Sequence, residues 1–164
     1  MDEIGVVHGR FQLFHTDHLK YVLEAKKRCK HLVIGICNPE PALTAHADAD
    51  PLRSTASHNP FTFYERLCMV KGSLLEAGVS PLDFDIVPFP INYPERISAY
   101  APKDAKYYMT IYDDWGRSKK ETLTSQGFDV EVMWDVELSD KGISGTDVRA
   151  LIKEGKDFST LVPP

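Results

Sequence analysis

The chain has 164 residues and a formal net charge of −5 at pH 7, with 43% hydrophobic and 26% charged residues. This length suits one folded domain, 1–164, and the acidic balance argues against a nucleic-acid binder, which usually carries a basic face. No apolar run approaches the roughly 18 residues of a membrane span, and the acidic N-terminus lacks signal-peptide features, so we expect a cytoplasmic protein with no membrane partner.

The N-terminal part of the chain predicts two strands that flank a helix. Residues 4–9 and 31–37 are short apolar runs rich in β-branched side chains, and the first of them ends in glycine. Between them, apolar residues recur at helical spacing over residues 17–29, with basic side chains in the last turn, as the helix dipole favours. The three segments together have the length of a right-handed βαβ unit.

Residues 38–59 contain three prolines and no sustained periodicity, which predicts a long loop that is either functional or disordered. A helix is predicted over residues 62–77, where Thr62 and Glu65 have the spacing of a capping box. Strands and helices then alternate, which indicates an α/β fold with a parallel sheet covered on both faces. The remaining elements are expected as strands at 84–90, 107–112 and 130–135, and helices at 115–126 and from near 144 to near 153.

The three cysteines form no C-x-x-C pair and are odd in number, which favours reduced, buried thiols over disulfides or a metal site. They are Cys29, Cys37 and Cys68.

The first strand leads directly into G-R-F-Q-L-F-H-T-D-H, residues 9–18, at the strand end where open α/β sheets bind ligands. His15 and His18 are three residues apart across the start of a helix, a spacing that places both side chains on one face. The helix N-terminus favours a phosphate, Gly9 allows close backbone approach and Arg10 adds a cation. The same residue types also suit a plain surface pair, or two metal ligands that need a third.

A second candidate segment is K-G-I-S-G-T-D-V-R, residues 141–149. Ser144 or Thr146 can cap a helix whose first amides point at an anion, and Arg149 lies where its guanidinium could reach the same phosphate chain. Taken alone, this segment equally fits a capped C-terminal helix with an exposed arginine.

In combination, these segments resemble the HxGH nucleotidylyltransferase superfamily, and within it the archaeal-type nicotinamide mononucleotide adenylyltransferases. The matching stretches are residues 9–18, 57–66 (S-H-N-P-F-T-F-Y-E-R), 87–92 and 143–149. The resemblance implies a Rossmann-like fold with a five-stranded parallel sheet in the order 3-2-1-4-5 and helices on both faces.

The resemblance also implies an enzyme that transfers AMP from ATP to a mononucleotide, most directly nicotinamide mononucleotide, giving NAD and pyrophosphate with Mg²⁺ bound to the nucleotide. Such enzymes act by positioning and charge stabilisation without a covalent nucleophile. Two alternatives stay open: another phosphorylated acceptor such as flavin mononucleotide, and a regulator that binds nucleotide without turnover. Relatives are often oligomers, so a homo-oligomer is open as well.

By match to the motifs, the resemblance implies catalytic roles for His15, His18 and Arg149, and no metal held by the protein. Asn92 and Tyr93, which follow the third strand, are expected to bind the acceptor. The residues expected to bind ATP lie in the two phosphate segments: Gly9, Arg10, Phe11, His15, His18, Ser144, Thr146 and Arg149.

The chain departs from the family pattern at three places. Asp17 replaces the glycine between the two histidines, where a carboxylate would repel a triphosphate unless it turns away or binds Mg²⁺. The stretch P-I-N, residues 90–92, is one aspartate shorter than the usual P-D-I-N, and residues 110–112 are T-I-Y where T-G-N is usual. The last two changes concern the acceptor side of the expected site and leave the donor side unchanged.

Overall fold

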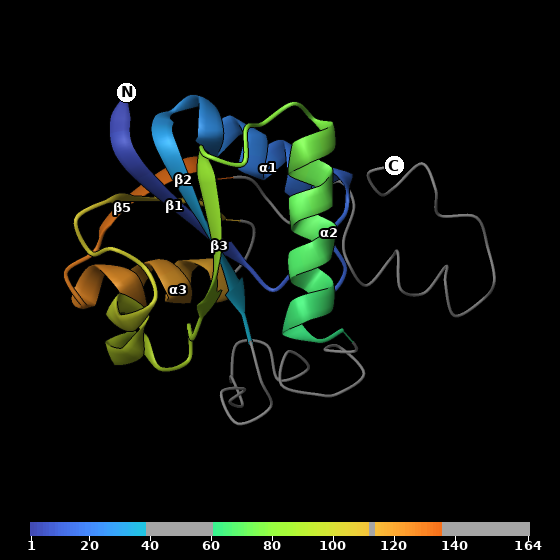
Figure 1. The fold of residues 1–164 in the computed structure, drawn as a ribbon. Coiled ribbons are helices and arrows are strands. Elements are labelled where there is room, and N and C mark those ends of the chain that lie inside the picture. The colour runs from blue at the N-terminus through green and yellow to red at the C-terminus, as the bar shows by residue number, and fades with distance from the viewer. Residues whose placement is uncertain (39–60, 112–113, 136–164) are drawn as a thin grey trace.

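A five-stranded parallel sheet forms the middle of the structure, a computed structural model that describes residues 1–38, 61–111 and 114–135 (Figure 1). The strand order is β3-β2-β1-β4-β5, as the family resemblance predicted. The strands are β1 (Asp2–Gly9), β2 (Cys29–Cys37), β3 (Phe84–Phe89), β4 (Lys106–Ile111) and β5 (Asp129–Asp135).

The described residues also form α1 (Thr16–Lys27), α2 (Phe63–Glu76), α3 (Asp114–Ser125) and the short 3-10 helix η4 (Pro94–Ala99). The predicted capping box at the start of α2 is confirmed. Thr62 Oγ1 accepts from the Glu65 N–H at 3.1 Å, and the Glu65 carboxylate accepts from the Thr62 N–H at 2.9 Å. Two N–H groups that the first turn would leave unpaired are thereby satisfied.

Helices cover both faces of the sheet, which confirms the predicted layers (Figure 1). On one face, Val22 of α1 and Val70 of α2 pack against buried side chains of the central strands. On the other face, Leu123 of α3 and Ile97 of η4 close a second apolar cluster. None of the helices among the described residues is long and apolar enough to cross a membrane.

The structure corrects two expectations. Cys29 begins β2 instead of ending the helix before it, and Cys68 is exposed on α2 while Cys29 and Cys37 are buried free thiols. Helix η4 was not predicted, because a six-residue helix has too few residues to establish a helical period. The predicted loop at 38–59, apart from Asn38, and the predicted helix near 144–153 lie outside the described residues.

The sheet topology fixes where a ligand can bind. β1 pairs with β2 over its whole length, from Asp2 to Gly9, but pairs with β4 only at Gly5 and Val6. The chain proceeds from β1 toward β3 on one side and continues with β4 and β5 on the other. The carboxyl ends of β1 and β4 therefore flank the point at which open α/β sheets bind their ligands.

Candidate functional site

Two histidines begin α1 as a stacked pair. His15 is the N-cap of the helix and is buried, and its ring lies 3.6 Å from that of His18 with 14° between the planes. Each Nδ1 accepts the other residue's backbone N–H at 3.3 Å. The two side chains do share one face, as their spacing predicted. Because both Nδ1 atoms act as acceptors, each neutral ring carries its proton on Nε2.

The Phe11 side chain packs against this histidine pair. Its backbone has a positive φ of 50°, its side chain is buried, and its ring meets the His18 ring edge-on at 5.0 Å. A Cβ on Gly9 would lie 2.5 Å from the Phe11 ring, so the glycine is required for this approach. The space beside Gly9 is thus filled by Phe11, and the Phe11 side chain serves as packing for the histidine loop.

Arg66, buried on α2, anchors the loop that follows β1. Burial lowers the pKa of its guanidinium to about 10, which still leaves the group charged at neutral pH. Among the described residues the guanidinium donates to backbone carbonyls: Arg10 at 2.9 Å, Cys37 at 2.6 Å, Asn38 at 2.8 Å and Thr62 at 3.1 Å. One side chain therefore joins the ends of β1 and β2 to α2.

Gln12 makes a second connection between the same elements. Its side-chain amide donates to the Phe61 carbonyl at 2.9 Å and accepts from the Phe61 N–H at 2.8 Å. The loop between β1 and α1 is consequently held to the start of α2 at both Gln12 and Arg10. A loop fixed at two points presents its side chains in one arrangement.

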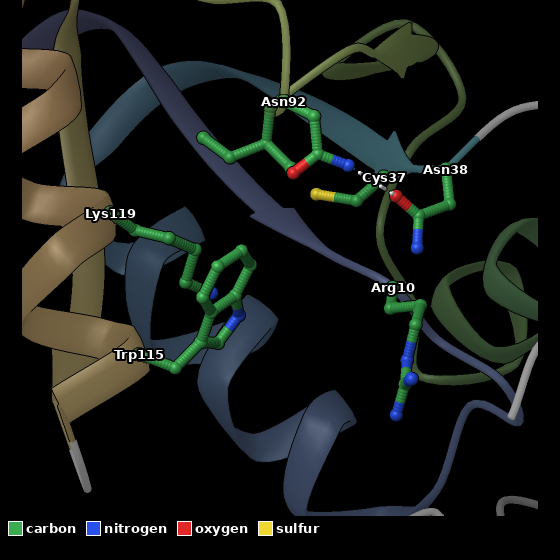
Figure 2. Close-up of a pocket in the computed structure, with 7 residues that line it drawn as sticks. Arg10, Cys37, Asn38, Asn92, Trp115 and Lys119 are labelled. Carbon is green, nitrogen blue, oxygen red and sulfur yellow. Dashed lines mark hydrogen bonds between the residues drawn. The ribbon is translucent and has the colours of Figure 1, made fainter. Parts of the chain in front are cut away.

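A pocket lies beside this loop, at the carboxyl ends of the strands (Figure 2). Its enclosed volume is about 20 Å³, and the roughly 340 Å³ of empty space around it includes open solvent. Figure 2 shows Trp115 and Lys119 of α3 on one side of the pocket and Arg10 on the other. The described residues that line it are Arg10, Cys37, Asn38, Ile91, Asn92, Trp115 and Lys119.

The lining of this pocket is cationic and rich in amides. Arg10 and Lys119 supply positive charge, and none of the described lining residues is acidic. Asn92 Nδ2 donates to Asn38 Oδ1 at 3.3 Å (Figure 2). This hydrogen bond fixes the orientation of both amides at the carboxyl end of β2. Such a lining suits a small ligand that carries several negative oxygens.

The structure brings part of the predicted site together. Arg10, which was expected to bind the nucleotide, and Asn92, which was expected to bind the acceptor, line the same pocket. Tyr93 is absent from the lining and packs instead beneath Arg96, whose guanidinium lies 5.1 Å from the Tyr93 ring centre. Asp17 lies half-buried in the first turn of α1. Three of the predicted phosphate ligands, Ser144, Thr146 and Arg149, lie outside the described residues.

Sequence reasoning did not single out Arg66, Lys119 or His8, a buried histidine of β1. Arg66 ends the stretch S-H-N-P-F-T-F-Y-E-R, so the motif signalled its importance without revealing its partners. Lys119 lies four residues after Trp115, a helical spacing that places both on one face of α3. The sequence around His8 did not indicate a functional role, since a lone histidine in an apolar strand does not reveal its surroundings.

The described part of the chain contains no set of side chains that could coordinate a metal ion by itself. No group of three or more His, Cys, Asp or Glu side chains there could hold an ion. The stacked histidines already use both Nδ1 atoms as acceptors, and Mg²⁺ prefers oxygen ligands. A Mg²⁺ ion that enters on the phosphates of a nucleotide, as expected from the resemblance, fits this arrangement.

Comparison with known proteins identifies relatives over the whole chain. The family model described as Cytidylyltransferase-like matches residues 6–151. The chain is 50% identical to a phosphonoformate cytidylyltransferase of Streptomyces viridochromogenes, over 98% of this chain and 86% of that protein. It is 26% identical to a nicotinamide-nucleotide adenylyltransferase of Methanolobus tindarius, over 94% of this chain and 80% of the relative.

Among solved structures, a bifunctional NMN adenylyltransferase/ADP ribose pyrophosphatase of Francisella tularensis superposes with a TM-score of 0.69. The sequence identity is 19%, and the match covers 99% of this chain and 44% of that protein. This chain thus spans less than half the length of that bifunctional protein. At such identity the likeness supports the fold alone.

Proposed function

We propose a CTP-dependent activity for this chain, which belongs to the cytidylyltransferase-like family of nucleotidylyltransferases. It transfers CMP from CTP to a small phosphonate that carries a second acidic group, the class that includes phosphonoformate. The observation that carries this proposal is the 50% identity, over 98% of the chain, to a protein named phosphonoformate cytidylyltransferase. The ATP donor and nicotinamide mononucleotide acceptor expected from the motifs have weaker support, since the relative with that activity is 26% identical.

The size of the pocket supports a small acceptor. Its enclosed volume among the described residues is about 20 Å³, far below the volumes typical of sites for drug-sized ligands. Phosphonoformate has only a phosphonate and a carboxylate joined by one bond, whereas nicotinamide mononucleotide adds a ribose and a ring to its phosphate. The smaller molecule requires less room beside the end of β1.

The charge of the pocket supports the same class. Phosphonoformate brings two acidic groups, and Arg10 and Lys119 offer one cation on each side of the space. The Asn38 and Asn92 amides add neutral hydrogen-bonding groups between them. An acceptor with acid groups at both of its ends is matched better by this lining than one that ends in a neutral carboxamide.

The reaction needs no covalent intermediate on the protein. A phosphonate oxygen of the acceptor attacks the α-phosphorus of CTP, a new P–O–P bond forms, and the bond from the α-phosphorus to the bridging oxygen of pyrophosphate breaks. The electron pair of that bond leaves with pyrophosphate. The protein accelerates this displacement by aligning the two phosphorus groups and by offsetting the negative charge that builds up between them.

The start of α1 is suited to hold the triphosphate. His15 and His18 carry their protons on Nε2, and the first N–H groups of the helix add positive potential in the same region. The Nδ1 contacts fix the orientation of both rings. Mg²⁺, when it enters with the nucleotide, would neutralise charge on the leaving pyrophosphate.

Product identification tests the proposal directly. The purified protein is incubated with Mg²⁺, with either CTP or ATP, and with phosphonoformate, nicotinamide mononucleotide, its acid analogue or flavin mononucleotide, and products are read by ³¹P NMR. We expect a CMP–phosphonoformate adduct and pyrophosphate from CTP. An adduct formed only from ATP and nicotinamide mononucleotide would overturn the proposal, and nucleotide binding without any pyrophosphate release would favour the regulatory alternative.

A further inference from the structure

His8 stands out among the described residues as a polar side chain without a polar partner in the core. It is 4% exposed, and neither ring nitrogen has a hydrogen-bond partner in the part of the chain that the structure describes. Its position lies within an apolar strand that otherwise buries valines, Val6 and Val7, at this level. Buried polar groups are nearly always satisfied, so an exception of this kind requires an explanation.

The surroundings of His8 belong to the pocket. Its ring stacks on Phe89 at 4.7 Å with 10° between the planes, and Phe89 is paired in register with Cys37 of the pocket lining. Arg10, which also lines the pocket, follows two residues later in the chain. Lys119, on the other side of the pocket, is the charged group whose field acts on the His8 ring. His8 is not itself a lining residue, but it contacts Phe89 behind the lining and lies within reach of the Lys119 charge.

Two features of the sheet make room for this ring. A Cβ on Gly35, the β2 partner of His8, would lie 2.5 Å from Phe89, so the glycine is what lets Phe89 cross β2 and reach the imidazole. β1 pairs with β4 only at Gly5 and Val6, so at the level of His8 the sheet is no longer closed between these strands. His8 thus lies on β1 beyond the last residue pair that joins this strand to β4.

The charge state of His8 suits a donor to an anion. Burial, and then the nearby Lys119 charge, hold the pKa of His8 well below the usual range of histidine. The neutral ring carries one N–H group. An oxygen that bound between Lys119 and His8 would receive one charged and one neutral hydrogen bond, and it would satisfy a nitrogen that lacks a partner in this structure.

We propose that His8 is a specificity-determining residue that donates a hydrogen bond to the second acidic group of the acceptor, beside Lys119. This inference rests on the proposed function. The acceptor's phosphonate must reach the α-phosphorus near the start of α1, so its other acid group is left to lie toward α3 and Lys119. For phosphonoformate this second group is the carboxylate.

The test compares His8→Phe with wild type on two probes, phosphonoformate and methylphosphonate, which lacks the carboxylate. Phenylalanine keeps the ring against Phe89 and removes both nitrogens. We expect the KM for phosphonoformate to rise roughly 10- to 100-fold, the loss of one hydrogen bond to a charged group, while the KM for CTP and the binding of methylphosphonate stay unchanged. His8→Gln, which restores a donor, is expected to recover part of the loss.

Thermal stability separates this role from a structural one. Because His8→Phe removes two unsatisfied nitrogens, its Tm should equal or exceed that of wild type. Tyr107→Phe is the matched control: Tyr107 is buried on the same face but its hydroxyl donates to the Pro102 carbonyl at 2.6 Å, so this variant should lower Tm and leave the acceptor KM unchanged.

The outcomes distinguish the two proposals. An unchanged phosphonoformate KM in His8→Phe, or an equal loss for both probes, would overturn the role of His8 while leaving the proposed function intact. Calorimetric binding of phosphonoformate to wild type without adduct formation would overturn the proposed function, and weaker binding to His8→Phe would still support His8. No binding of phosphonoformate to wild type would overturn both.

Discussion

The guanidinium of Arg66, on α2, donates to the backbone carbonyl of Arg10 at 2.9 Å, across 56 positions of the sequence. The same nitrogen also donates to Cys37 at 2.6 Å, so a single buried group sets the spacing between the ends of β1 and β2. Both strand ends border the pocket. The geometry of the site therefore depends on a residue that does not line it.

Arg66→Leu is expected to destabilise the protein strongly. The change leaves several buried carbonyls without donors, at about 1–3 kcal/mol each. Urea denaturation measures the loss. Arg117→Leu is the control, since Arg117 pairs with Asp114 at 3.3 Å on the surface and such pairs contribute about 0–1 kcal/mol. Equal losses in the two variants would contradict the anchoring role of Arg66.

His18→Ala should reduce kcat by about 10²–10³, the typical effect of removing one preorganised donor from a transferring group. The fold should persist, because the helix keeps its core contacts. Pyrophosphate release measures the rate. His31→Ala is the matched control: His31 pairs with Asp85 at 2.9 Å, toward the opposite end of the strands, and its loss should leave kcat unchanged. An unaltered kcat in His18→Ala would refute the phosphate site.

Asp17→Gly tests the departure between the two histidines. If the carboxylate faces the phosphates, its removal should tighten nucleotide binding, because a like-charge repulsion disappears. If it faces solvent, affinity should be unchanged and stability slightly lower, since glycine is a poorer helix residue. Isothermal titration of both proteins decides between them. Weaker binding in Asp17→Gly would contradict both readings and indicate a carboxylate that acts through Mg²⁺.

The stability of the protein should depend on pH through His8. Its pKa is lowered in the folded state, so below about pH 6.5 the unfolded chain takes up a proton that the folded chain does not. The free energy of unfolding should therefore fall as the pH drops below that value, and His8→Phe should remove this part of the slope. Urea titrations at several pH values measure it, and identical slopes would contradict a buried neutral imidazole.

Most of the fold was predictable from local pattern. Every strand predicted between residues 4 and 135 is present, with ends shifted by up to two residues. The shifts are physical: α1 starts at Thr16 because His15 serves as its cap, a role that the residue seldom plays. The sheet order came from the resemblance, since strand periodicity alone does not give the order of neighbours.

The site was predictable only where neighbours in sequence are also neighbours in space. His15 and His18 satisfy that condition, because three residues separate them on one helix. The contacts of Arg66 and the surroundings of His8 join separate strands and helices, and no local pattern encodes them. The motifs cannot distinguish between donor nucleotides, since residues that hold a triphosphate act on groups that ATP and CTP share.

A competition measurement compares the two donor–acceptor pairs in one reaction. CTP with phosphonoformate and ATP with nicotinamide mononucleotide are supplied together at equal concentrations with Mg²⁺, and the initial rates of the two adducts are compared. The ratio of the two initial rates reports the ratio of the specificity constants for the two donor–acceptor pairs. We expect the cytidylyl adduct to exceed the adenylyl adduct by roughly 10²-fold or more. A ratio near one, or an excess of NAD, would contradict it.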